Sequence, residues 1–363
     1  MNEKIRLAHI TKNMVINGIS NVIMNYSVNL DKNMFDITII AGNPIHETYK
    51  DVCSKNGITI VQLPEKVDDT KRYYKKLFQT LHNGKFDIVH VHGNSATISV
   101  ELMLAKMAGC HNRIAHSHNS TCDNLRVHKL LYPFFRKLYT VGLACSKKAG
   151  DWLFRSDEYH VLQNAFDTRK FAYDRDKRNV LRTNLSIGDD FAILCVGRVN
   201  EQKNYPYLLK IFEAVAAEKK DAQLILVGDG PELSKVLDIV DRHPYKERII
   251  YYGTTDHVEE LYSLADVFVL PSKFEGLGIV FIEAQISGLP VITSDQVPLE
   301  VDIGNRVQFL ALSEQVDEWK KAVLYATSVD RKNFYSTHQN EIEQYDIRKN
   351  AKILSDLYIS LLR

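Results

Sequence analysis

Short apolar runs alternate with amphipathic stretches along almost the whole chain, and this alternation is the strongest constraint on its fold. Seven runs in the first half are typical of buried strands that end in turn or polar residues: 4–10, 35–42, 57–63, 86–93, 111–118, 141–146 and 159–164. The segments between them, such as 20–30 and 70–81, have the periodicity of helices. Strand–helix alternation on this scale predicts an α/β fold with a doubly wound parallel sheet.

The second half repeats the pattern. Its strand-like runs are 191–198, 222–230, 248–253, 266–272, 289–295 and 306–310, and its helical segments are 205–218, 231–240, 257–265 and 278–288. A chain of 363 residues is longer than one hydrophobic core usually supports. We therefore predict two Rossmann-like domains, 1–165 and 166–345, with the polar segment 166–190 as the connection and an amphipathic helix at about 346–363.

Composition and charge narrow the class of protein. With 45% apolar and 25% charged residues the chain is typical of soluble globular proteins, and neither a membrane-spanning run nor a signal-peptide core is evident, so we expect a cytoplasmic location. Five scattered cysteines argue against a disulfide framework or structural zinc. Residues 1–165 hold 21 Lys and Arg against 14 Asp and Glu (+7), and the remainder holds 25 against 31 (−6), so the halves are expected to meet different ligands.

Ligands of open α/β sheets bind beyond the carboxyl ends of the strands, so the residues that follow the predicted strands are the candidates. In 266–288, Gly276 and Gly278 allow a tight turn into a helix whose first amides can bind an anion. Glu275 precedes that helix and Glu283 lies on it, where both carboxylates can accept hydrogen bonds from sugar hydroxyls. The alternative is that Glu275 only complements the helix dipole and Glu283 is a half-buried surface residue.

Arg198 and Lys203 follow the strand at 191–198 and suit a diphosphate, although they can equally be solvated surface cations. The glycines at 228 and 230 lack the third glycine of a dinucleotide fingerprint, and the P-loop motif is missing too. Both omissions argue against a Rossmann dehydrogenase and a P-loop NTPase.

In the first half, Gly18 lies where a helix should begin. Its backbone amide could approach a phosphate, or the glycine could simply form a structural turn. The histidine pairs His90/His92 and His116/His118 lie near strand ends. They have no carboxylate or cysteine at a matching spacing, so hydrogen bonding to a sugar or phosphate is favoured over a metal site. We expect no metal and no cofactor.

Several segments together resemble the bacterial retaining glycosyltransferases of family 4, in particular the capsular and exopolysaccharide branch. They are NGISNVIMNY, DIVHVHG, IAHSHN, LQNAFD, VGRVNEQKN, LVGDGP, ADVFVLPSKFEGLGIVFIEAQISGLPVITSD and VPLEVDI. The resemblance implies a GT-B fold, with two domains facing a cleft and the last helix crossing back to the first domain. The first domain would take the acceptor and the second the nucleotide-sugar donor.

The resemblance also implies residue roles. Glu275 would contact the donor sugar and Glu283 the ribose, Arg198 and Lys203 would bind the diphosphate, and the amides at Gly276 and Leu277 to Ile279 would add donors. His118 would face the donor sugar, with His116 as a substitute. Many relatives have Gly-Gly in the first loop where this chain has Asn17-Gly18.

The implied reaction moves a sugar, with retention and without a metal, from a UDP-sugar or similar donor to a hydroxyl of a polyprenyl-diphosphate-linked saccharide. The alternatives are a nucleotide-sugar epimerase on the same fold and a non-catalytic nucleotide-sugar sensor. Arg126, Lys129, Arg136 and Lys137 lie among aromatic and leucine residues, which predicts peripheral docking on the anionic inner face of the plasma membrane. In 70–81 we favour packing of the aromatic residues on the sheet. No nucleic-acid partner is expected.

Overall fold

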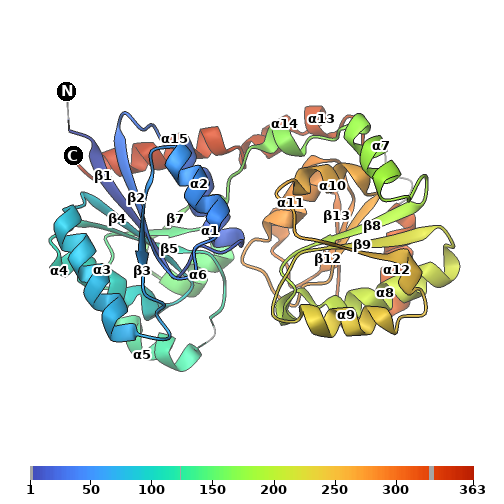
Figure 1. The fold of residues 1–363 in the computed structure, drawn as a ribbon, viewed down its shortest axis with the longest axis horizontal. Helices are drawn as coiled ribbons and strands as arrows, with labels where there is room; N and C mark the ends of the chain where they lie inside the picture. Colours follow the sequence, from blue (N-terminus) through green and yellow to red (C-terminus); the bar gives the residue numbers. More distant parts are fainter. Residues whose placement is uncertain (1–2, 123, 327–330) are drawn as a thin grey trace. The chain divides into compact units, whose positions relative to one another are not determined.

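The computed structural model describes residues 3–122, 124–326 and 331–363, which form two compact units. The first unit runs to Phe166 and also includes Gln344–Arg363, and the second is Asp167–Glu343. Each unit is a parallel sheet flanked by helices (Figure 1). The prediction of two doubly wound Rossmann-like α/β domains is confirmed.

The first unit contains a seven-stranded sheet in the order β3-β2-β1-β4-β5-β6-β7. Its strands are β1 (Ile5–Thr11), β2 (Phe35–Gly42), β3 (Thr59–Leu63), β4 (Ile88–Gly93), β5 (Asn112–Ser117), β6 (Val141–Ala144) and β7 (His160–Val161). Its helices are α1 (Gly18–Asn29), α2 (Glu47–Lys55), α3 (Thr70–Gly84), α4 (Ser99–Met107), α5 (Leu125–Phe135), α6 (Lys147–Phe154) and α15 (Ile347–Ser360). The central strands are buried on both faces, which is why they read as continuous apolar runs.

The second unit contains a six-stranded sheet in the order β10-β9-β8-β11-β12-β13. Its strands are β8 (Phe191–Val196), β9 (Ala222–Val227), β10 (Ile249–Gly253), β11 (Val267–Leu270), β12 (Val291–Ser294) and β13 (Val307–Leu310). Its helices are α7 (Arg175–Asn184), α8 (Tyr205–Glu218), α9 (Leu233–Asp241), α10 (Val258–Leu264), α11 (Ile279–Ile286), α12 (Val316–Tyr325), α13 (Phe334–Thr337) and α14 (Gln339–Glu343).

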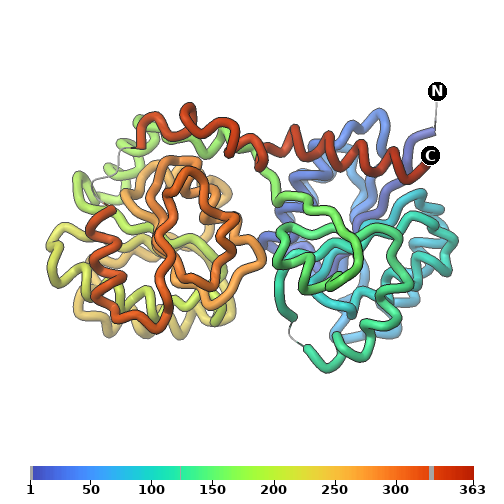
Figure 2. The backbone as a smooth tube through the Cα atoms, turned by 180° about the vertical axis from the view of Figure 1, so that it is seen from behind, coloured from blue at the N-terminus to red at the C-terminus, as the bar shows by residue number. Residues whose placement is uncertain are grey.

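The last helix belongs to the first unit although it follows the second in sequence. Figure 2 shows α15, in red, lying over the N-terminal part of the chain. Ile347, Ala351, Leu354 and Tyr358 recur every three or four residues on one face of α15 and are part of the hydrophobic core that contains α1 and the sheet. Burial of this apolar stripe holds the helix in place.

In both sheets the strand order reverses next to the first strand, between β1 and β4 and between β8 and β11. The loops that leave neighbouring strands at such a point run in opposite directions and leave a crevice at the carboxyl edge. The predicted site residues of each unit lie at these two edges.

Candidate functional site

Two loops at the carboxyl edge of the second sheet hold most of the predicted donor-binding residues. The loop after β8 contains Arg198 and ends in a short 3₁₀ helix, η3 (Glu201–Lys203). The loop after β11 contains Glu275 and leads into α11. Because β8 and β11 are paired, with Val267 opposite Ile193, the two loops leave the sheet side by side.

The loop after β8 is held by the backbone of the next loop along the sheet. The amide of Val199 donates to the carbonyl of Asp229 over 3.0 Å, and Gly228 has a φ of +135°. A Cβ at Gly228 would lie only 2.0 Å from the carbonyl oxygen of Gly197, so no side chain fits there. This close approach explains the glycine at position 228 without a dinucleotide.

A buried ion pair joins the two loops. The ammonium of Lys203 lies 2.5 Å from Oε1 of Glu275, and the two side chains are only 12% and 6% exposed. The Ser272 hydroxyl donates to the same oxygen over 2.7 Å, and the Gln202 amide donates to Oε2 over 3.1 Å. The carboxylate of Glu275 is thus fixed in position and charge-balanced. Sequence reasoning placed both residues in one site but did not predict that they pair.

Arg198 is different, because its side chain is exposed. Within the described parts of the chain, its guanidinium makes no hydrogen bond or ion pair. It therefore remains available to bind an anion at the same edge as Lys203.

Helix α11 begins with no side-chain cap from the described residues. Its N-cap is Gly278, with φ of +81°, and a Cβ there would lie 2.6 Å from the Phe281 ring. Leu277 is buried beside it, and Gly276 lies in the loop before it. The amides from Ile279 onward face the loop that holds Glu275, so the positive end of the helix dipole lies at this edge.

Glu283 lies one turn into α11, where it is half-buried. The Tyr262 hydroxyl donates to its Oε2 over 2.8 Å. The pKa of the Glu283 carboxyl is raised to about 7, chiefly because burial disfavours the charged form. The hydrogen bond from Tyr262 acts in the opposite sense, and the charge of Glu259 adds to the rise.

In the first unit, Gly18 is the first residue of α1, directly after the loop that leaves β1. Asn17 is the N-cap, and its side-chain oxygen accepts from the amide of Ser20 over 2.9 Å. The asparagine that replaces a glycine of the family pattern therefore has a structural role as a cap. A Cβ at Gly18 would meet nothing within 4 Å.

The four predicted histidines form one buried layer, and a fifth, which sequence reasoning missed, joins them. His9 lies on β1 opposite His90 on β4, and His92 lies opposite His116 on β5. His118 follows β5 directly. Side chains alternate between the two faces of a sheet, so these rings lie on one face. The position of His9 in the strand that pairs with β4 could have indicated that it joins the other histidines.

Burial keeps all five imidazoles neutral. It lowers the pKa of His9 and His118 to about 3 and holds the pKa values of the other three well below the ordinary value. Two groups of three have ligand nitrogens within 4.8 Å of one another, His9/His90/His92 and His92/His116/His118. These groups contain only histidine, and their rings hydrogen-bond to one another.

One of the predicted membrane-facing cations is not free. Arg136 forms a two-pronged ion pair with Asp157, with Nε to Oδ2 at 2.7 Å. The Arg136 side chain is nevertheless 49% exposed, so its contact with lipid stays a prediction, while its charge is balanced by a carboxylate. On α3 the lysines are exposed, while Tyr73, Leu77 and Leu81 are buried against the unit.

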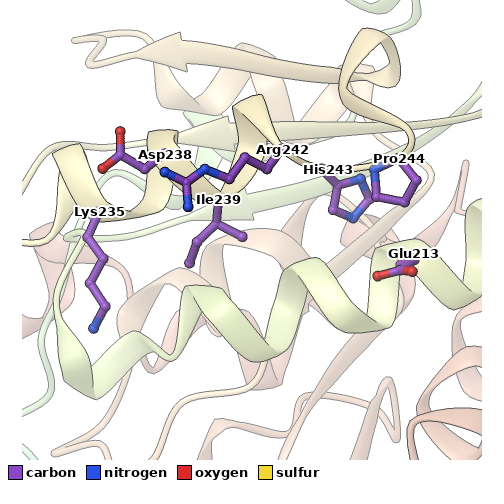
Figure 3. Close-up of a pocket in the computed structure, with 7 residues that line it drawn as sticks. All are labelled: Glu213, Lys235, Asp238, Ile239, Arg242, His243 and Pro244. Carbon is purple, nitrogen blue, oxygen red and sulfur yellow. The ribbon is translucent and has the colours of Figure 1, made fainter.

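A separate pocket of about 450 Å³ lies between α8 and α9. Figure 3 shows Glu213 on one side and Lys235, Asp238 and Arg242 on the other. None of the predicted site residues lines it.

The buried Lys203–Glu275 pair predicts that removing its lysine lowers stability more than removing a lysine from an exposed ion pair. Lys203→Met should lower the free energy of unfolding by about 3–5 kcal/mol at pH 7.5, because it leaves the Glu275 carboxylate buried without its counter-ion. Lys273→Met is the matched control, since its pair with Glu201 is 41% and 81% exposed and should contribute less than about 1 kcal/mol. Urea unfolding of both variants checks this, and equal losses would contradict the buried pair.

The chain matches two family models that together span most of its length. Residues 16–170 match "Glycosyltransferase Family 4" and residues 176–353 match "Glycosyl transferases group 1". EpsF of Bacillus subtilis (strain 168) is 29% identical over 97% of this chain and 96% of its own length. A UDP-Gal:alpha-D-GlcNAc-diphosphoundecaprenol alpha-1,3-galactosyltransferase of Escherichia coli is 25% identical over 99% and 98%.

Solved structures agree on the fold. Anabaena Alr3699/HepE, crystallised with UDP and glucose, superposes with a TM-score of 0.83 over 98% of this chain and 100% of its own, at 14% identity. WaaG, a glycosyltransferase of lipopolysaccharide biosynthesis, superposes with a TM-score of 0.75 over 97% and 99%. The chain therefore belongs to glycosyltransferase family 4 and has the GT-B fold.

Proposed function

We propose that this protein transfers a sugar, with retention of configuration, from a UDP-sugar to a hydroxyl of a polyprenyl-diphosphate-linked saccharide during capsular or exopolysaccharide synthesis. The observation that carries the proposal is the fixed Glu275 carboxylate beside Lys203, Arg198 and the uncapped start of α11. The relatives support the choice of substrates, since one is named for a UDP-galactose donor and a diphosphoundecaprenol-linked acceptor. Another was crystallised with UDP and glucose.

In this proposal the second domain, 166–345, binds the donor. The exposed guanidinium of Arg198 and the ammonium of Lys203 bind the diphosphate, together with the amides at the start of α11. Glu275 accepts hydrogen bonds from the sugar hydroxyls, and Glu283 accepts them from the ribose. Lys203 would then lie between the Glu275 carboxylate and a phosphate oxygen, so that its positive charge offsets the negative charge of both groups.

The first domain, 1–165, completed by the final helix, binds the acceptor and presents His118 to the donor sugar. During transfer the bond from the anomeric carbon to the diphosphate oxygen breaks, and a bond to the acceptor oxygen forms on the same face. The acceptor proton passes to the departing phosphate oxygen. Arg198, Lys203 and the helix amides stabilise the developing diphosphate charge, so no metal is required.

The α5 surface supports a membrane-bound acceptor. Leu125, Leu130 and Phe134 are 46%, 71% and 63% exposed, and Lys129 and Lys137 lie exposed among them. Apolar side chains beside free cations suit an anionic lipid surface. No helix in the described parts of the chain is long and apolar enough to span a bilayer, so contact through α5 would be peripheral.

Replacing Glu275 tests the catalytic assignment. Glu275→Gln keeps the shape of the side chain but removes its charge, and we expect transfer to fall at least about a hundredfold while nucleotide binding persists. Glu201→Gln, on the neighbouring loop and exposed, is the control and should stay active. Turnover is measured with a panel of nucleotide sugars and lipid-linked acceptors in EDTA. More than about a tenth of the wild-type rate in Glu275→Gln would refute the role.

The same assay separates the rival activities. Epimerisation of donor without acceptor would indicate an isomerase, and binding with no turnover of any donor would indicate a sensor. Loss of all activity in EDTA would show that a metal is needed after all.

The raised pKa of the Glu283 carboxyl predicts that donor binding depends on pH. With a pKa near 7 the free carboxyl is largely protonated below that pH, and only the carboxylate accepts two ribose hydroxyls well. Affinity for a nucleotide sugar should therefore rise from pH 5.5 to 8 and level off above about 7, since the diphosphate ester does not titrate there.

Isothermal titration calorimetry across this range checks the prediction. Glu283→Gln should bind weakly with a flat profile, whereas Glu259→Gln should keep the dependence with its midpoint at lower pH, because Glu259 raises the pKa. A flat wild-type profile would exclude a titrating Glu283.

Membrane docking is tested with liposomes. The protein should sediment with anionic but not neutral vesicles, and less so as salt rises from low to physiological strength. Lys129→Glu/Lys137→Glu should abolish this binding. Lys71→Glu/Lys75→Glu, an equal charge change on exposed positions of α3, should largely retain it. Equal binding to neutral vesicles, or equal losses in both double variants, would rule out docking through α5.

A further inference from the structure

Gln202 lies in η3, directly before Lys203, and contacts three consecutive residues of the loop after β11. Its backbone carbonyl accepts from the amide of Lys273 over 2.7 Å. Its side-chain amide donates to the carbonyl of Phe274 over 2.9 Å and to Oε2 of Glu275 over 3.1 Å. Because an amide group has two N–H donors, both of these bonds can form at once.

The donors around Glu275 are divided between its two oxygens. Lys203 and the Ser272 hydroxyl both contact Oε1, at 2.5 and 2.7 Å. Of these three donors, Gln202 is the one that contacts Oε2. The terminal torsion of a glutamate side chain has only broad preferences. Donors on both oxygens therefore define the orientation of the carboxylate more narrowly than donors on one oxygen.

The two segments that Gln202 joins are each anchored by other contacts. In η3 the Asn200 side chain accepts from the amide of Lys203 over 3.2 Å. In the loop after β11 the Ser294 hydroxyl, at the end of β12, donates to the carbonyl of Ser272. The backbone bond from Lys273 to residue 202 also persists with any side chain at that position. Replacing the Gln202 side chain should therefore leave both segments folded.

We propose that Gln202 is a positioning residue that sets the orientation of the Glu275 carboxylate for sugar transfer. It acts through Glu275, since a tilt of this carboxylate moves its oxygens relative to the hydroxyls of a bound donor sugar, and transfer rates depend steeply on such alignment. The inference rests on the proposed function for the role of Glu275. The contact between Gln202 and Glu275 is a property of the unliganded protein.

Steady-state kinetics of Gln202→Met test the positioning role, because methionine has a similar length and no N–H donor. We expect kcat to fall roughly threefold to tenfold, the size expected for one hydrogen bond. The dissociation constant for UDP, measured by calorimetry, should change less than about twofold, since UDP has no sugar for Glu275 to contact. An unchanged kcat would overturn the proposal.

The matched control is Gln223→Met. The Gln223 amide donates to the Asp190 carboxylate over 2.8 Å, at the amino edge of the same sheet. This variant loses the same kind of hydrogen bond away from the candidate site, so its kcat should equal that of the wild type. An equal fall of kcat in both variants would attribute the effect to general loosening of the unit and overturn the positioning role.

A double variant separates action through Glu275 from a purely structural role of Gln202. In the Glu275→Gln background the carboxylate is gone, so adding Gln202→Met should lower the residual kcat by less than about twofold. If Gln202 only supported the loop, the same threefold to tenfold loss would occur in both backgrounds. That additive result would overturn the proposal.

Urea unfolding of the same four proteins tests the contact without any activity. Gln202→Met should raise the unfolding equilibrium constant about threefold more in the wild type than in Glu275→Gln, because only the former loses a bond to a carboxylate. Equal effects would overturn the contact, whatever the protein catalyses. If the wild type turns over no nucleotide sugar, the proposed function fails, and the unfolding cycle still decides whether Gln202 holds the carboxylate.

Discussion

Reversal of the strand order beside β1 and β8 is the constraint on which the rest of the structure depends. Parallel strands buried on both faces leave no room for charge along their length. The charged side chains of the candidate donor site collect where loops diverge at the carboxyl edge. The Lys203–Glu275 pair, the N-terminal end of α11 and the end of the histidine layer all lie at such edges.

The two acidic residues of the candidate site in the second unit, Glu275 and Glu283, differ in how many hydrogen-bond donors surround them. Glu275 is buried but surrounded by donors from Lys203, Ser272 and Gln202, which offset its desolvation. Glu283 is partly buried with one hydroxyl partner, so its pKa rises to about 7. The Glu275 carboxylate is thus held by several fixed donors within the protein, while Glu283 has a single donor among the described residues; in the proposed function, ribose hydroxyls supply further donors to Glu283.

The histidine layer shows how polar groups are accommodated inside a parallel sheet. His9, His90 and His92 lie where apolar residues would normally pack. His9 and His92 hydrogen-bond to each other, and the His90 ring stacks on His92 and hydrogen-bonds to His116 and Tyr358. Burial keeps them uncharged, which avoids the cost of isolated cations. The ring nitrogens that have no hydrogen-bond partner among the described residues lie at the ends of these hydrogen-bonded rows of histidines. Tyr358 of α15 hydrogen-bonds to one of the rows.

Periodicity and turn residues in the sequence by themselves determined the strands, the two domains and the fold. Parallel strands that are buried on both faces require runs of apolar residues, and such runs are local features of the sequence. The sequence also placed Arg198, Lys203 and Glu275 in the loops after strands, and Glu283 on the helix that follows Glu275. Only the tertiary structure decided that Lys203 pairs with Glu275, that Arg136 is bound to Asp157 and that His9 joins the other histidines. Those contacts join residues 21 to 83 positions apart, and their distances depend on sheet order and loop packing, which no local pattern encodes.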